Sequence, residues 1–156
     1  MQALKEQQIK LSEKILNTAY ALKQMLRVLL NDTNLINNRA DFFTFNDKNK
    51  KATSERLYSL FSVNASQTSN IMSNLANKNA ELASLLIAAD KAMDIELIAV
   101  CEKQFTAYEQ LEKNYFNYIT AIENENLNSN LTINFLVKTI KKLELELDNF
   151  ISIYTD

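Results

Sequence analysis

Glycine and proline are both absent from this 156-residue chain. At average usage of about 7% and 5%, a chain of this length would carry roughly 11 glycines and 8 prolines. Because these residues form most tight turns and hairpins, their absence argues against a sheet protein. Long helices joined by corners rich in Asn and Ser remain, since Asn tolerates the left-handed conformation that ends a helix. The composition therefore predicts an all-α protein.

Histidine and tryptophan are also absent, and there is a single cysteine. Without glycine the chain has no P-loop, no dinucleotide fingerprint and no nucleophile elbow. Without histidine it has no Ser-His couple, no HExxH zinc site and no Glu-x-x-His di-iron site. One cysteine excludes an intramolecular disulfide and a zinc site built from cysteines alone. We therefore predict that the protein is not an enzyme and has no catalytic residues, cofactor or metal.

Charge and apolar content indicate a protein that neither binds nucleic acid nor spans a membrane. The net charge is -2 and 47% of residues are apolar, whereas a nucleic-acid partner would need a basic face. Apolar runs such as residues 85–89 are far shorter than the ~20 residues that span a bilayer. The first residues, Met-Gln-Ala-Leu-Lys-Glu, lack the apolar stretch of a signal peptide. A lone cysteine suits a reducing compartment, so we expect a cytoplasmic location.

Apolar residues recur at steps of three and four along most of the chain, which is the spacing of an amphipathic helix. The first stripe runs through Leu11, Ile15, Ala19, Leu22 and Leu26. The run Asn-Ala-Ser-Gln-Thr-Ser-Asn at residues 64–70 resembles a loop that provides helix caps. We predict one all-helical domain over residues 1–156, with helices at about 3–37, 42–63, 68–92, 95–123 and 129–154.

The last third of the chain keeps one register for more than fifty residues. Its apolar positions continue from Ile98 to Tyr154, interrupted only by the polar segment Glu123–Asn130. This pattern predicts one long helix or two nearly collinear halves, with a kink or an exit from the bundle at that segment. The period near 3.5 favours coiled-coil-like packing. The expected architecture is an elongated antiparallel helical bundle or coiled coil with a long C-terminal helix.

Three smaller features have an ordinary structural interpretation. Cys101 lies on the apolar stripe without a histidine to activate it, so we expect a core residue. The lysines at positions 48, 50 and 51 suit a solvated helix face. The cluster of Phe42, Phe43 and Phe45 is either an end cap of the core or a partner-binding knob.

The strongest candidate for partner binding is the apolar face of the last predicted helix. We call it the C-terminal stripe, and it consists of Ile133, Leu136, Ile140, Leu143, Leu147, Phe150 and Tyr154. If the chain kinks before it, this face is uncovered and can dock another helix. The alternatives are that it packs inside the protein as the last bundle helix, or that it forms a homodimer.

Leucines, acids and lysines follow one another in a particular order along the N-terminal half. They are Leu11-Ser12-Glu13, then Leu22, Met25, Val28-Leu29, Asp32, Leu35 or Ile36, and Lys50 or Lys51 with Leu57 and Leu60. In this order the N-terminal half resembles the FlgN family of flagellar export chaperones. A further similarity is Asn128-Ser129-Asn130-Leu131, which looks like the family's Asn-Gly-x-Leu step with Ser in place of Gly. The resemblance implies a cytoplasmic helical chaperone that binds the C-terminal helices of hook-associated proteins through residues 133–154.

We therefore predict a secretion chaperone whose client is a helical protein, held unassembled before export. One alternative is a structural coiled-coil or adaptor protein that self-associates through the same stripe. Another is a coat for hydrophobic particles, because residues 82–122 loosely resemble the phasins. These three functions need the same amphipathic surface, so periodicity alone does not separate them.

Overall fold

In a computed structural model, the described residues of the protein form a bundle of four helices. The structure describes the backbone of residues 2–42, 47–124 and 130–155, and the side chains of residues 3–33, 55–123 and 134–155. The helices are α1 (Gln2–Phe42), α2 (Asp47–Lys91), α3 (Ile95–Asn124) and α4 (Asn130–Thr155). Within the described backbone only residues 92–94 are not helical. The predicted all-α class is confirmed.

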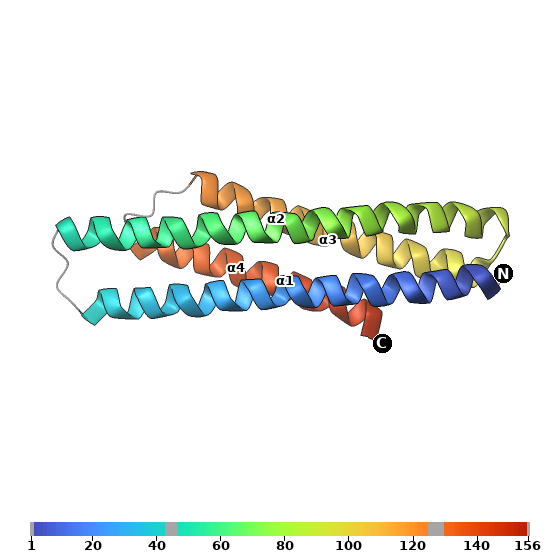
Figure 1. Cartoon of the computed structure of the whole chain (residues 1–156), viewed down its shortest axis with the longest axis horizontal. Helices are drawn as coiled ribbons and strands as arrows, with labels where there is room; N and C mark the ends of the chain where they lie inside the picture. The colour runs from blue at the N-terminus through green and yellow to red at the C-terminus, as the bar shows by residue number, and fades with distance from the viewer. Residues whose placement is uncertain (1, 43–46, 125–129, 156) are drawn as a thin grey trace.

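Neighbouring helices run antiparallel, and each helix packs on two others. The packed pairs are α1 with α2, α2 with α3, α3 with α4, and α4 with α1. This up-and-down arrangement places the chain's first and last helices side by side (Figure 1). The core therefore lies along the axis between the four helices, as is usual for such bundles.

The helices differ in length, which leaves the bundle uneven at both ends. The first two contain 41 and 45 residues, whereas α3 and α4 contain 30 and 26. At 1.5 Å per residue, α1 is roughly 60 Å long and α4 roughly 40 Å. At one end α1 and α2 project past α3 and α4, and at the other end α4 stops short of the N-terminus (Figure 1).

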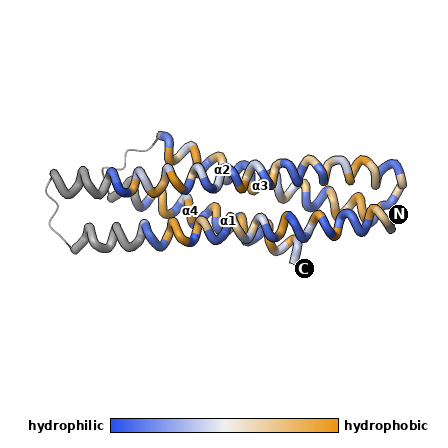
Figure 2. The backbone as a smooth tube through the Cα atoms, in the orientation of Figure 1, coloured by the Kyte–Doolittle hydropathy of each residue, from blue (hydrophilic) through white to orange (hydrophobic). Residues whose placement is uncertain are grey.

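Apolar side chains at helical spacing form the core. In α1 the predicted stripe from Leu11 to Leu29 is buried throughout. It continues in the other three helices with fully buried residues such as Leu75, Leu111 and Leu147. Figure 2 shows the resulting alternation of apolar and polar stretches along each helix. Burying each large side chain of this kind contributes about 1.5–3 kcal/mol.

The loop predicted at residues 64–70, between the second and third predicted helices, is wrong, because α2 continues through these residues. Asn64 and Thr68, one turn apart, are 5% and 0% exposed and lie on the core side of the helix. The Thr68 hydroxyl donates to the Asn64 carbonyl oxygen at 2.8 Å. The side chains of these two residues, whose types usually favour turns, thus have hydrogen-bond partners while they lie within the helix, and the helix continues without a break.

The C-terminal third also differs from the prediction of one long helix or two collinear halves. The chain reverses between α3 and α4, and the two helices pack side by side. Folding back buries the apolar face of α4 against the bundle, which a collinear extension would leave in water. The Phe42–Phe45 cluster and the three lysines at positions 48–51 lie outside the residues whose side chains the structure describes.

The turn between α2 and α3 uses methionine where helices usually end in glycine or asparagine. Met93 has a φ of 57°, in the left-handed region. The amide of Asp94 donates to the Ala89 carbonyl at 3.1 Å, closing the end of α2. The Asp94 carboxylate then accepts from the Leu97 amide at 3.2 Å and caps α3.

Candidate functional site

The C-terminal stripe, the candidate partner surface, lies inside the closed bundle. Its members Leu136, Ile140, Leu143, Leu147 and Phe150 are at most 2% exposed. Tyr154 is partly buried and packs against the core, and the side chain of Ile133 lies outside the described residues. The C-terminal stripe is therefore the inner face of the last bundle helix, which is one of the two alternatives predicted from the sequence. Partner binding through it stays a prediction, and it requires α4 to leave its place.

Two ion pairs join α4 to α1. The Lys23 ammonium is 2.7 Å from the Asp148 carboxylate, and the Arg27 guanidinium is 3.7 Å from that of Glu144. Each pair is partly exposed, so solvent and salt reduce its contribution to about 0.2–1 kcal/mol. Apart from these ion pairs, the described side chains of α4 make no hydrogen bond to another helix; the remaining attachment of α4 is apolar.

By contrast, α1, α2 and α3 are joined by a buried hydrogen-bond network. The Tyr118 hydroxyl of α3 donates to Asn64 Oδ1 of α2 at 2.6 Å. The Asn64 amide nitrogen in turn donates to the Met25 carbonyl of α1 at 3.1 Å. One side chain of α2 therefore links three helices, and any sliding of one helix would break these bonds.

A second branch of the network involves Tyr115. Its hydroxyl is 2.9 Å from the hydroxyl of Thr68 and 2.9 Å from that of Ser69. The Tyr115 hydroxyl also lies 3.5 Å from the Ala65 carbonyl, to which it can donate. The rings of Tyr115 and Tyr118 pack edge to face, with centroids 6.0 Å apart. Burial, followed by the neighbouring Tyr115, raises the pKa of Tyr118, which keeps this hydroxyl a donor.

The single cysteine is a core residue, as predicted. Cys101 is fully buried, and its pKa is raised by burial and secondarily by the negative charge of Asp94. A thiol with a raised pKa forms little thiolate and is a poor nucleophile. Burial also raises the pKa of Tyr154 on α4, with Cys101 as the neighbouring group. Tyr154 packs against the same buried cluster that contains Cys101.

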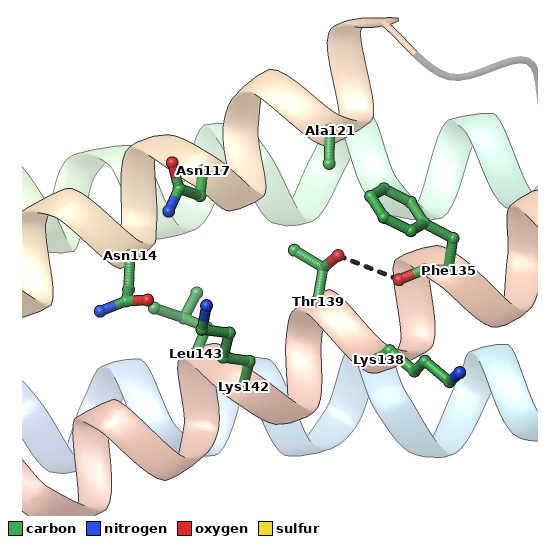
Figure 3. A pocket seen from close by; sticks show the side chains of 8 residues that line it. All are labelled: Asn114, Asn117, Ala121, Phe135, Lys138, Thr139, Lys142 and Leu143. Carbon is green, nitrogen blue, oxygen red and sulfur yellow. Dashed lines mark hydrogen bonds between the residues drawn. The ribbon is translucent and has the colours of Figure 1, made fainter.

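A shallow cleft of about 340 Å³ lies between α3 and α4. Asn114, Asn117 and Ala121 line it from α3, and Phe135, Lys138, Thr139, Lys142 and Leu143 line it from α4. Figure 3 shows Thr139 donating to the Phe135 carbonyl of its own helix, at 2.9 Å. The lining contains ammonium and amide groups and the Thr139 hydroxyl, and it contains no carboxylate or thiol.

The described residues include no group of three or more Cys, Asp or Glu side chains able to hold a metal ion. None of the described helical stretches is long and apolar enough to cross a bilayer.

Comparisons of the chain with models of known families, with curated proteins and with solved structures find no match.

The sequence analysis did not predict the hydrogen-bond network that joins α1, α2 and α3, nor the two ion pairs that join α4 to α1. The hydrogen-bond network had a signal in the sequence, since Asn64 and Thr68 are one turn apart on the apolar side of α2. Tyr115 and Tyr118 fall on the apolar stripe of α3, where a buried hydroxyl needs a partner. The ion pairs had no signal, because basic residues occur along the whole of α1 and pairing depends on the register of α4.

Proposed function

We propose that the chain is a non-enzymatic cytoplasmic chaperone that binds an amphipathic helix of a client protein through the C-terminal stripe. The resemblance to the FlgN family suggests the C-terminal helices of flagellar hook-associated proteins as clients. The observation that carries the proposal is the attachment of α4. Polar bonds join α1, α2 and α3 to each other, whereas α4 is held by apolar burial and two partly exposed ion pairs.

The proposed mechanism is an exchange of one helix partner for another. Releasing α4 exposes its large apolar side chains, and each costs about 1.5–3 kcal/mol when it is transferred to water. A client helix that covers the stripe restores the burial of the α4 side chains. The faces of α1 and α3 that α4 leaves stay in water, so the exchange requires a client whose apolar contacts with the stripe exceed those that α4 makes in the bundle. The ion pairs of Lys23 and Arg27 add about 0.2–1 kcal/mol each to the closed form. The client is thereby kept from pairing with its own assembly partners until export.

The experiment reverses charges on α1 and leaves the C-terminal stripe intact. The substitutions Lys23→Glu and Arg27→Glu place like charges opposite Asp148 and Glu144 and should favour release of α4. The matched control adds Glu144→Lys and Asp148→Lys, which restores opposite charges in the same places. Alkylation of Cys101, the only thiol, reports opening of the core in which it is buried, and circular dichroism confirms that the fold is retained.

Binding is measured with the purified C-terminal segment of a hook-associated protein from the same organism. We expect the doubly reversed variant to be alkylated faster and to bind the segment several-fold more tightly, and the fourfold variant to behave as the wild type. Equal binding by all three proteins, or none by any of them, would refute the proposal. Formation of an oligomer by the opened variant without a client would favour the self-associating alternative.

A further inference from the structure

The cleft between α3 and α4 has two ends of different chemistry. At one end the Phe135 ring of α4 reaches toward Ala121 of α3, and at the other end Lys142 of α4 extends toward Asn117 of α3 (Figure 3). Phe135 and Lys142 are seven residues apart, so the two ends are roughly 10 Å apart along the helix axis. The cleft volume of about 340 Å³ is within the range of sites that hold small organic ligands.

The polar end offers hydrogen-bond donors that the bundle itself does not use. Among the side chains that the structure describes, the carboxylates of the two ion pairs bind Lys23 and Arg27, and none lies within ion-pairing distance of Lys142. Asn117 is exposed, and its amide group makes no hydrogen bond to the described residues. A carboxylate placed here would therefore gain two donors, one of them charged.

The apolar end presents carbon rather than polar atoms. Phe135 is 48% exposed although it is a large aromatic residue. The Thr139 hydroxyl donates to the Phe135 carbonyl at 2.9 Å, so its hydrogen bond is made within α4 and its methyl group lines the space between the two ends (Figure 3). Covering the Phe135 ring and this methyl group removes apolar surface from water.

We propose that the cleft binds a small organic anion that carries a carboxylate at one end and an aromatic or aliphatic group at the other. The carboxylate accepts hydrogen bonds from Lys142 and Asn117, and the apolar group covers Phe135 and Ala121. The charge of the lining determines the sign of the ligand, because it contains two ammonium groups and no carboxylate. The same charge argues against a second copy of the chain that places its own cleft opposite, since like charges would meet.

The cleft exists while α4 is packed against α3, so this inference does not depend on the proposed release of α4. Both helices contribute to the lining. A ligand that contacts both walls binds the closed bundle and not the form from which α4 has left, and it therefore stabilises the closed bundle.

The test titrates the full chain with 4-phenylbutyrate and follows the backbone amide signals of Ala121 and Thr139 by NMR. We expect saturable shifts of both signals. Acetate supplies the charge without the ring, and 4-phenylbutan-1-ol supplies the ring without the charge. Each of these two compounds should bind several-fold more weakly than 4-phenylbutyrate, because each engages only one end of the cleft.

Substitutions at the two ends identify the site. Lys142→Gln and Phe135→Ala should each weaken binding of 4-phenylbutyrate several-fold, and both replace exposed side chains. Lys141→Gln is the matched control, because Lys141 is an exposed lysine of the same helix that does not line the cleft. It should leave binding unchanged. The absence of saturable shifts, equal binding of acetate or of the alcohol, or unchanged binding by Lys142→Gln would overturn the inference.

Discussion

The hydroxyl of Tyr118 provides the most direct test of the buried network. The substitution Tyr118→Phe removes one oxygen and leaves the ring, which is fully buried. The hydroxyl donates to Asn64 Oδ1 at 2.6 Å, away from water. Its loss leaves the amide oxygen of Asn64 buried without that donor. A buried polar atom without a partner costs about 1–3 kcal/mol.

This free energy corresponds to a fall in Tm of roughly 3–9 °C for a chain of this size. Replacing both partners removes the unpaired atom, so Asn64→Leu combined with Tyr118→Phe should cost less than the sum of the single changes. A coupling free energy of about 1 kcal/mol or more is expected between the two positions. As a control, Tyr20→Phe alters a residue that is 47% exposed and should change stability by less than about 0.5 kcal/mol.

Urea unfolding followed by circular dichroism measures the free energy of unfolding of all four variants and the wild type. If the hydrogen bond between Tyr118 and Asn64 is buried as described, the costs of the two substitutions are not additive and Tyr20→Phe leaves the free energy of unfolding unchanged. If Tyr118→Phe proved as silent as Tyr20→Phe, the hydroxyl would have no buried partner, and the network could not hold α1, α2 and α3 in register. Additive costs at positions 64 and 118 would lead to the same conclusion.

Three further predictions concern other parts of the bundle. Met93→Gly should raise the free energy of unfolding by about 1 kcal/mol in a urea titration, because glycine adopts the left-handed conformation without strain; a loss of stability would contradict the assigned turn. Burial raises the pKa of Tyr108 and Tyr118, so the folded state retains protons that the unfolded state releases. Their contribution to the free energy of unfolding is thus complete below pH ~10 and should fall at higher pH. In urea titrations above pH ~10, the free energy of unfolding of Tyr118→Phe should fall less steeply with pH than that of the wild type; equal slopes would contradict the raised pKa of Tyr118. Finally, Leu147→Ala should cost about 2–5 kcal/mol and Leu145→Ala less than about 0.5 kcal/mol in thermal melts, since these residues are 0% and 59% exposed; similar costs would mean that α4 does not pack as described.

The helical class and the core of α1 could be predicted because both depend on local properties of the chain. The lack of glycine and proline excludes most turns, and the α1 stripe needs only its own periodicity. The loop predicted at residues 64–70 was wrong because Asn64 is satisfied by Tyr118, 54 residues away, outside any local window.

For the candidate site, the sequence identified the apolar face of α4 but not what covers it. That depends on whether the chain reverses after α3, and no glycine or proline near residues 123–130 marks a reversal.

The two ion pairs have a further consequence for how α4 is aligned. The stripe on α4 repeats every seven residues, so a shift of one heptad, about 10.5 Å along the axis, would return apolar residues to the groove. Shifted toward the N-terminus of α1, α4 would place Lys141 opposite Lys23 and Val137 opposite Arg27. The first contact is repulsive and the second leaves a cation without a counter-charge. Lys23 and Arg27 therefore select one axial alignment among several that apolar packing alone would accept.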